Sequence, residues 1–97
     1  MISVLKVSGK SMEPEFLSGD YLLVRKVFRP QKLRQGTDIV VSHKKLGLIL
    51  KRVSLVDKVQ QQIECHGLHP ESTSQKEIGR IRFEDIRGVP LFRIPKP

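Results

Sequence analysis

The central stretch of the chain, TDIVVSHKKLGLILKRVSLV (residues 37–56), contains two runs rich in Val, Ile and Leu. The first run covers residues 37–43 and the second covers residues 46–56. β-branched and large apolar side chains that alternate with polar ones favour β-strands. Between the runs, Lys45-Leu46-Gly47 has the composition of a turn. This stretch therefore predicts two strands with a short connection between them.

The same period of two extends outward from the central stretch in both directions. No window shows the 3.6-residue period of a long amphipathic helix. Several short strands with turn signals between them predict an all-β fold, either coiled sheets or a partly open barrel of short antiparallel strands. The further strands are expected at residues 2–7, 20–28, 59–65, 78–86 and 88–94.

The length, composition and charge limit the kinds of protein that this chain can represent. Its 97 residues, 38% hydrophobic and 29% charged, are expected to form a single domain, residues 1–97, with a thin core. The formal net charge is +8, but the Lys and Arg residues are scattered as pairs and form no single block. One Tyr and no Trp are a poor platform for stacking bases. We therefore expect no nucleic-acid partner, and we assign the charge to solubility or to attraction of an acidic peptide.

The cysteine content and the lack of long apolar runs indicate in which cellular compartment the protein is expected. Cys65 is the single cysteine, so the fold needs no oxidising compartment. No apolar run reaches the roughly 18 residues of a membrane span. The first ten residues, MISVLKVSGK, lack the features of a signal peptide. These features predict a cytoplasmic protein with no transmembrane segment in this chain, although association with a membrane stays open.

Metal and acid–base motifs are weak in this sequence. Asp20 and Asp38 follow Gly or Thr and are expected to shape turns. A structural zinc site needs four ligands at recognised spacings, and a second pair of ligands is missing here. We expect no metal, no cofactor, and a buried Cys65 at a strand end. The residues of metal-binding type that lie together in the sequence are Glu64, Cys65, His66 and His69.

Ser11 lies in the turn-rich segment VSGKSMEPEFLSGDYLLV, residues 7–24. A serine hydroxyl is a poor nucleophile unless a base removes its proton. None of the histidines (His43, His66 and His69) sits in a triad motif. A lysine can act as the base when burial lowers its pKa, and alternation places Lys51 on the same face as Ile49 and Val53. The alternative interpretation is a simple turn at Ser11 and an edge-strand lysine that discourages aggregation.

Four segments, in order along the chain, resemble the signal peptidase I type of serine peptidase. SGKSMEP followed by SGDYLLV resembles the G-x-S-M-x-P turn that carries the nucleophile. TDIVVSH and LILKRVSLV resemble the next two boxes, the second of which carries the general-base lysine. GLHPESTSQKEIG resembles a divergent last box, so the resemblance extends from residue 7 to residue 89. LexA-type repressors share the Ser/Lys dyad and the β fold, so the dyad alone does not choose between them.

The resemblance implies a signal peptidase/LexA-type fold and roles for individual residues. Ser11 matches the nucleophile, and Lys51 matches the general base. Ser72 matches the serine that hydrogen-bonds the catalytic lysine. The backbone N–H of Ser11 matches an oxyanion-hole donor. The residues that match the substrate-binding and oxyanion positions are Gly9, Lys10, Met12 and Pro14.

The short length and the HPESTS form of the last box are most similar to the small maturation peptidases of nickel-type superoxide dismutase. The implied partner is a precursor protein with an N-terminal leader, and the nickel would belong to that substrate. The alternative is a non-catalytic β module that binds peptide or nucleic acid, in which SGKSMEP is only a turn. A self-cleaving regulator is the least favoured interpretation, because 97 residues leave no room for a helix-turn-helix.

Overall fold

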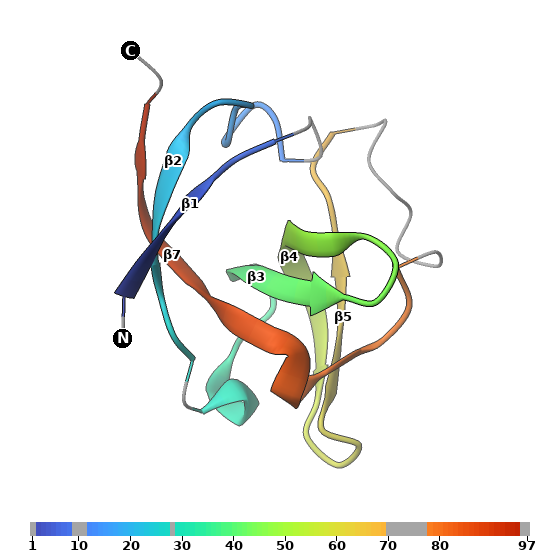
Figure 1. Cartoon of the computed structure of the whole chain (residues 1–97). Coiled ribbons are helices and arrows are strands. Elements are labelled where there is room, and N and C mark those ends of the chain that lie inside the picture. The colour runs from blue at the N-terminus through green and yellow to red at the C-terminus, as the bar shows by residue number, and fades with distance from the viewer. Residues whose placement is uncertain (1, 9–11, 28, 70–77, 96–97) are drawn as a thin grey trace.

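The computed structural model describes residues 2–8, 12–27, 29–69 and 78–95. These residues form one antiparallel sheet of seven strands in the order β1-β2-β7-β3-β4-β5-β6 (Figure 1). The end strands β1 and β6 do not pair with each other, so the described sheet is open. The predicted all-β fold of short antiparallel strands is confirmed. The strands are β1 (Ile2–Lys6), β2 (Tyr21–Arg25), β3 (Asp38–His43), β4 (Gly47–Asp57), β5 (Gln62–His66), β6 (Ile81–Arg82) and β7 (Ile86–Ile94).

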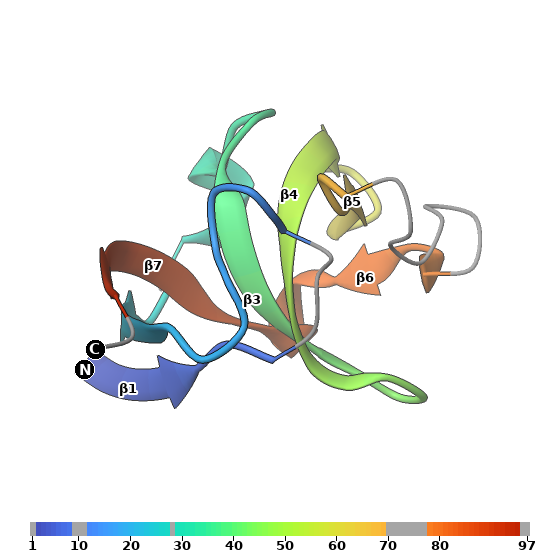
Figure 2. The ribbon, with the colours of Figure 1, turned by 90° about the horizontal axis from the view of Figure 1, so that it is seen from above.

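Strand β3 lies at the middle of the sheet and separates two clusters of buried side chains. Ile39 and Val41 point into the larger cluster, and Val40 points into the smaller one, because successive side chains of a strand face opposite sides. Figure 2 shows β3 and β4 at the centre, with β1 and β7 on one side and β5 and β6 on the other. The larger cluster also contains Val53, Ile63, Cys65, Ile78, Ile81 and Ile86, and the smaller one contains Leu22 and Val24.

Strand β7 joins the two parts of the sheet. Its first part pairs with β3, where Gly88 lies opposite Val40, and its later part pairs with β2, where Val89 lies opposite Arg25. The register shifts in both ladders near this crossing, so the strand bends there. A Cβ atom on Gly88 would lie 2.6 Å from the carbonyl oxygen of Arg25 and 2.6 Å from Cγ1 of Val24. Glycine therefore allows β2 and β7 to approach closely at this bend.

Several expected strands have different limits in the structure: the one expected at residues 20–28 spans only Tyr21–Arg25, and the one expected at residues 88–94 begins already at Ile86. The strand expected at residues 59–65 begins only at Gln62, because residues 58–61 form a turn in which Gln61 has a φ of 55°. The strand expected at residues 78–86 is reduced to β6, and Phe83–Asp85 form the 3-10 turn η2. A second 3-10 turn, η1 (Pro30–Lys32), precedes β3. Within the described ranges, no helix has the length and apolar character needed to cross a bilayer.

Replacing Gly88 with alanine should destabilise the fold. The added methyl group must displace the backbone of β2, and overpacking of this kind typically costs about 1–3 kcal/mol. Urea unfolding should show this loss for Gly88→Ala. The control Ser3→Ala, at an exposed position of β1, should change the free energy of unfolding by less than about 0.5 kcal/mol. Equal stability of Gly88→Ala and the wild type would contradict the close approach of β2 and β7.

Candidate active site

A pocket of about 350 Å³ lies between the end of β1 and the first half of β4. One wall is formed by Leu5 to Ser8 and by Met12, and the other wall is formed by residues 48–51 of β4. Leu22 and Val40 are 2% exposed and also line the pocket, so β2 and β3 supply its base. The pocket therefore combines a mainly apolar lining with one buried amine, that of Lys51.

Lys51 lies in the middle of β4 with only 2% of its surface exposed. The strand register places it opposite Ile39 of β3, and two positions further along β4 Val53 lies opposite Cys65 of β5. These three neighbours are fully buried. Withdrawal from water lowers the pKa of Lys51 below 10.5, and Cys65 has a smaller, opposite effect. Lys51 therefore gives up its proton more readily than an exposed lysine, as a general base must.

Cys65 of β5 is part of the buried surroundings of Lys51. Val53 and Cys65 are opposite each other, and Lys51 shares the face of Val53, so Lys51 and Cys65 are diagonal neighbours on one face of the sheet. Burial raises the pKa of the Cys65 thiol to about 11. The thiol is therefore neutral at neutral pH and places no negative charge beside the amine. A carboxylate at this position would instead favour the protonated lysine.

Arg52 follows Lys51 and points to the opposite face of β4. Its Nε atom donates to Oδ1 of Asp38 at 2.7 Å, its NH2 group lies 3.1 Å from Oδ2 of Asp38, and NH2 also binds the carboxylate of Glu15. The hydrogen bonds to Asp38 make the largest contribution to raising the pKa of Arg52. Because Glu15 is three positions after Met12, this ion pair fastens the segment that carries Met12 to β4.

A family model described as Peptidase S24-like matches residues 2–82 of the chain. The chain belongs to this family. Searches of curated proteins and of solved structures returned no match. Membership supports a serine peptidase activity in general for this S24-like peptidase, which confirms the peptidase interpretation of the sequence at that level. The Ser/Lys dyad and the signal peptidase I type stay predictions.

The structure brings together two of the predicted site residues of this S24-like peptidase. Lys51 and Met12 line the same pocket, and Met12 is 2% exposed. Pro14 is exposed and is not among the lining residues of this pocket, so its predicted role in substrate binding stays a prediction. The remaining predicted site residues, which lie outside the described part of the chain, are Gly9, Lys10, Ser11 and Ser72.

Two histidines hold strands together. Nδ1 of His43 accepts the backbone N–H groups of Lys45 and Leu46, each at 3.1 Å, so the proton is on Nε2, which donates to the carbonyl oxygen of Ile78 at 2.9 Å. The ring thereby joins the β3–β4 turn to the residues before β6. Nδ1 of His66 lies 2.5 Å from Oγ of Ser54 across the irregular β4–β5 pairing. Neither ring lines the pocket of Lys51.

The acidic residues singled out in the sequence also have structural partners. Oδ2 of Asp20 accepts the backbone N–H of Leu17 at 2.9 Å, so it shapes the turn as predicted. Asp38 instead lies opposite Arg52 in the strand pairing and forms an ion pair across the two strands. Glu64 binds Arg80 at 3.1 Å. Among the described residues, His, Cys, Asp and Glu side chains form no group of three or more that could hold a metal ion.

The apolar wall of the pocket on β4 was missed from the sequence. Leu46 and Leu48 line the pocket although 43% and 58% of their surfaces are exposed. Alternation places Leu48 on the same face of β4 as Leu50 and the charged Arg52, while Leu46 belongs to the turn before the strand. Two leucines on a strand face that also carries an arginine, with a third leucine in the adjoining turn, are unusual for a solvated surface, and this signal was available in the sequence.

Replacing Lys51 with methionine should raise the free energy of unfolding at neutral pH. The folded chain holds the Lys51 proton less tightly than the unfolded chain, so wild-type stability rises with pH from the lowered pKa up to 10.5. Methionine carries no proton, so the advantage of Lys51→Met should be largest below the lowered pKa and should shrink toward pH 10.5.

Urea unfolding of both proteins at several pH values across this window measures the effect. The control Lys45→Met replaces an exposed lysine of the neighbouring turn and should show no advantage that depends on pH. A stability difference between wild type and Lys51→Met that stays constant over the whole window would contradict the desolvation of Lys51.

Proposed function

We propose that this S24-like peptidase is a serine endopeptidase of the signal peptidase I type with a Ser11/Lys51 dyad. Its proposed substrate is a precursor protein from which it removes an N-terminal leader. The proposed reaction is metal-independent. Family membership supports the peptidase chemistry, and the burial of Lys51 supports its assignment as the general base.

One observation carries the proposal: a desolvated lysine, Ser8 and Met12 line the same pocket, and Ser11 immediately precedes Met12 in the sequence. Ser8 and Met12 flank residues 9–11 in the sequence, and both line the pocket with Lys51. Ser11 is joined to Met12 by a peptide bond, so the two Cα atoms are about 3.8 Å apart. The positions of Ser8 and Met12 therefore support the proposal that Ser11 lies near the pocket that contains Lys51.

The proposed reaction begins with the neutral Lys51 amine. Nζ of Lys51 takes the proton of the Ser11 hydroxyl as Oγ attacks the carbonyl carbon of the scissile peptide bond. The backbone N–H of Ser11 stabilises the negative charge that develops on the carbonyl oxygen. The Lys51 ammonium then returns its proton to the leaving amine, which gives an acyl-enzyme and frees the first product. Water, activated by the neutral amine, hydrolyses the acyl-enzyme and restores Ser11.

The pocket suits an extended peptide with apolar side chains. Strand β1 is at the end of the strand order, so its outer edge is available for a further strand. A substrate strand that added there would present alternate side chains to the pocket. The lining by Leu5, Val7, Met12 and Leu48 favours small apolar side chains next to the cleaved bond.

The candidate precursor is nickel-type superoxide dismutase. This assignment is supported by the similarity of the HPESTS segment to the last box of the small maturation peptidases of that enzyme. In this proposal the nickel ion is bound by the substrate after its leader has been removed. The peptidase itself needs only its hydroxyl and its amine.

Replacing Ser11 with alanine or Lys51 with methionine should abolish leader removal. Loss of a nucleophile or of its base typically lowers kcat by a factor on the order of 10⁴ or more. Incubation with the leader-bearing dismutase precursor, followed by mass measurement of the products, gives the readout. Lys45→Met, at an exposed position, should cleave like the wild type. Full cleavage by both dyad variants would disprove the dyad, whereas binding without cleavage by the wild type would favour a non-catalytic module.

The pH dependence of kcat/KM should show an acidic limb that reports Lys51. Activity requires the neutral amine, so kcat/KM rises with pH as the proton is lost, and burial places the midpoint of the limb below 10.5. Initial rates on a fluorogenic peptide that contains the leader cleavage site measure this limb. A rate that falls as pH rises across the same range would contradict a lysine base.

A further inference from the structure

A second hollow, of about 710 Å³, lies away from the pocket of Lys51 and is rich in positive charge. Arg25 at the end of β2, Lys32 of η1, Arg34 and Arg93 of β7 line it. A neighbouring hollow of about 350 Å³ shares Arg25 and Lys32 with it and adds Arg29. We call these two adjoining hollows the basic cleft. Five cations within residues 25–34 thus surround one concave surface: Arg25, Lys26, Arg29, Lys32 and Arg34.

Four of the cations that line the basic cleft form no ion pair with a described carboxylate, in contrast to the arginines that hold elements of the fold together. Arg52, Arg80, Arg82 and Arg93 each bind a carboxylate. By contrast, no carboxylate of the described residues lies within ion-pair distance of Arg25, Arg29, Lys32 or Arg34. All four of these side chains are exposed. Unpaired like charges that converge on one concavity create a positive potential that attracts anions.

The acidic side chains in the cleft do not remove this potential. Glu15 and Asp38 line the hollow and both bind the guanidinium of Arg52, whose single positive charge balances one of their two negative charges. Asp20 lies 3.5 Å from NH1 of Arg93, so the charge of Arg93 is already partly balanced. The four cations Arg25, Arg29, Lys32 and Arg34 outnumber the one negative charge that remains, so the cleft keeps an excess of positive charge.

The cleft also has an apolar wall formed by the end of β7. Pro90, Leu91 and Phe92 line it, and 44% of Leu91 and 57% of Phe92 are exposed. Phosphate groups gain nothing from such a wall, whereas a peptide can place apolar side chains on it and carboxylates on the guanidinium groups. One Tyr and no Trp in the whole chain also make a nucleic-acid platform less suitable.

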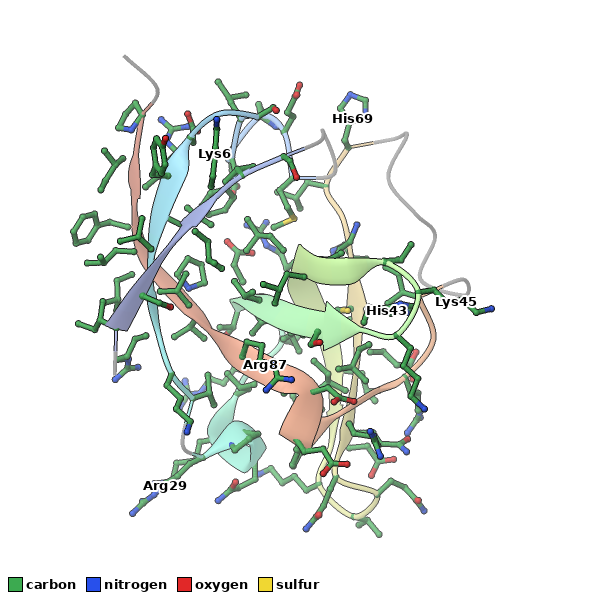
Figure 3. All side chains as sticks on the ribbon, in the orientation of Figure 1. Lys6, Arg29, His43, Lys45, His69 and Arg87 are labelled. Atoms are coloured by element: carbon green, nitrogen blue, oxygen red, sulfur yellow. The ribbon has the colours of Figure 1, made fainter. Side chains whose placement is uncertain are left out.

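We propose that the basic cleft binds an acidic peptide segment of a partner protein, in which Asp or Glu residues alternate with apolar residues. This site is separate from the pocket of Lys51, because the two sets of lining residues have no member in common. Figure 3 shows Lys6, which lines the pocket, and Arg29 of the cleft toward opposite ends of the molecule. The proposal concerns binding alone, so it stands whether or not Ser11 and Lys51 perform hydrolysis.

Fluorescence anisotropy with a labelled peptide of alternating Glu and Leu residues tests the proposal. Wild type is compared with the triple variant Arg25→Gln/Lys32→Gln/Arg34→Gln and with the control Lys44→Gln/Lys45→Gln/Lys58→Gln. The two variants lose the same three charges, but the control positions are exposed turn residues outside the cleft. We expect the cleft variant to bind roughly tenfold or more weakly, because three ion pairs are lost. The control should stay within about twofold of the wild type, and urea unfolding should show that both variants are folded.

Three results would overturn the proposal. The first is no binding of the Glu/Leu peptide by the wild type. The second is an equal loss of affinity in both triple variants, which would make net charge alone responsible. The third is tighter binding of a labelled single-stranded oligonucleotide than of the peptide, together with a loss of oligonucleotide affinity in the variant of Arg25, Lys32 and Arg34. A weaker affinity for a Glu/Ser peptide of equal charge, and a further loss with Phe92→Ser, would support the apolar wall.

Discussion

The removal of one amine from water is the constraint on which the proposed chemistry depends. An ammonium group at 2% exposure has lost most of its hydration, and the fold accepts this cost at Lys51. The neighbours across the strands, Ile39 and Cys65, bear no negative charge at neutral pH. A carboxylate in either position would stabilise the ammonium and remove its basicity. The apolar interior of the sheet is thus what makes a lysine usable as a base.

Adjacent residues on β4 meet opposite electrostatic environments. Lys51 faces the buried cluster and has a lowered pKa, while Arg52 faces Asp38 and Glu15 and has a raised pKa. The pleat of the strand produces this contrast, because it sends successive side chains to opposite sides. The ion pairs of Arg52 attach the segment of Met12 to the same strand that carries Lys51, the proposed base.

The positive charge of the chain is divided between two uses. Some arginines fasten elements together, as when Arg80 binds Asp57 and Glu64 around β5. Others, such as Arg25 and Arg34, project into a concavity and pair with no described carboxylate. Part of the net charge of +8 is therefore concentrated on one surface, where the proposed acidic peptide would bind.

The sequence by itself indicated where most of the strands lie and on which side of its strand Lys51 projects. Alternation is a local property of extended backbone, so residues 37–56 were enough to place Lys51 with Ile49 and Val53. The resemblance to a peptidase family supplied Ser11 as the partner of Lys51. The strand limits near residues 58–61 were less predictable. Gln61 has a φ of 55°, and a glutamine in the sequence does not indicate such a left-handed turn conformation.

Only the tertiary structure decided which strands lie side by side. The order β1-β2-β7-β3-β4-β5-β6 places the last strand between the second and the third. This order brings Cys65 beside Lys51, and it brings Met12 and Leu48 to the walls of one pocket. It also places Phe92 near the cations of the β2–β3 connection. These contacts join segments far apart in the chain, and their choice depends on packing both faces of β3. A local pattern carries no information about the partner of a strand, so this arrangement could not be inferred from periodicity.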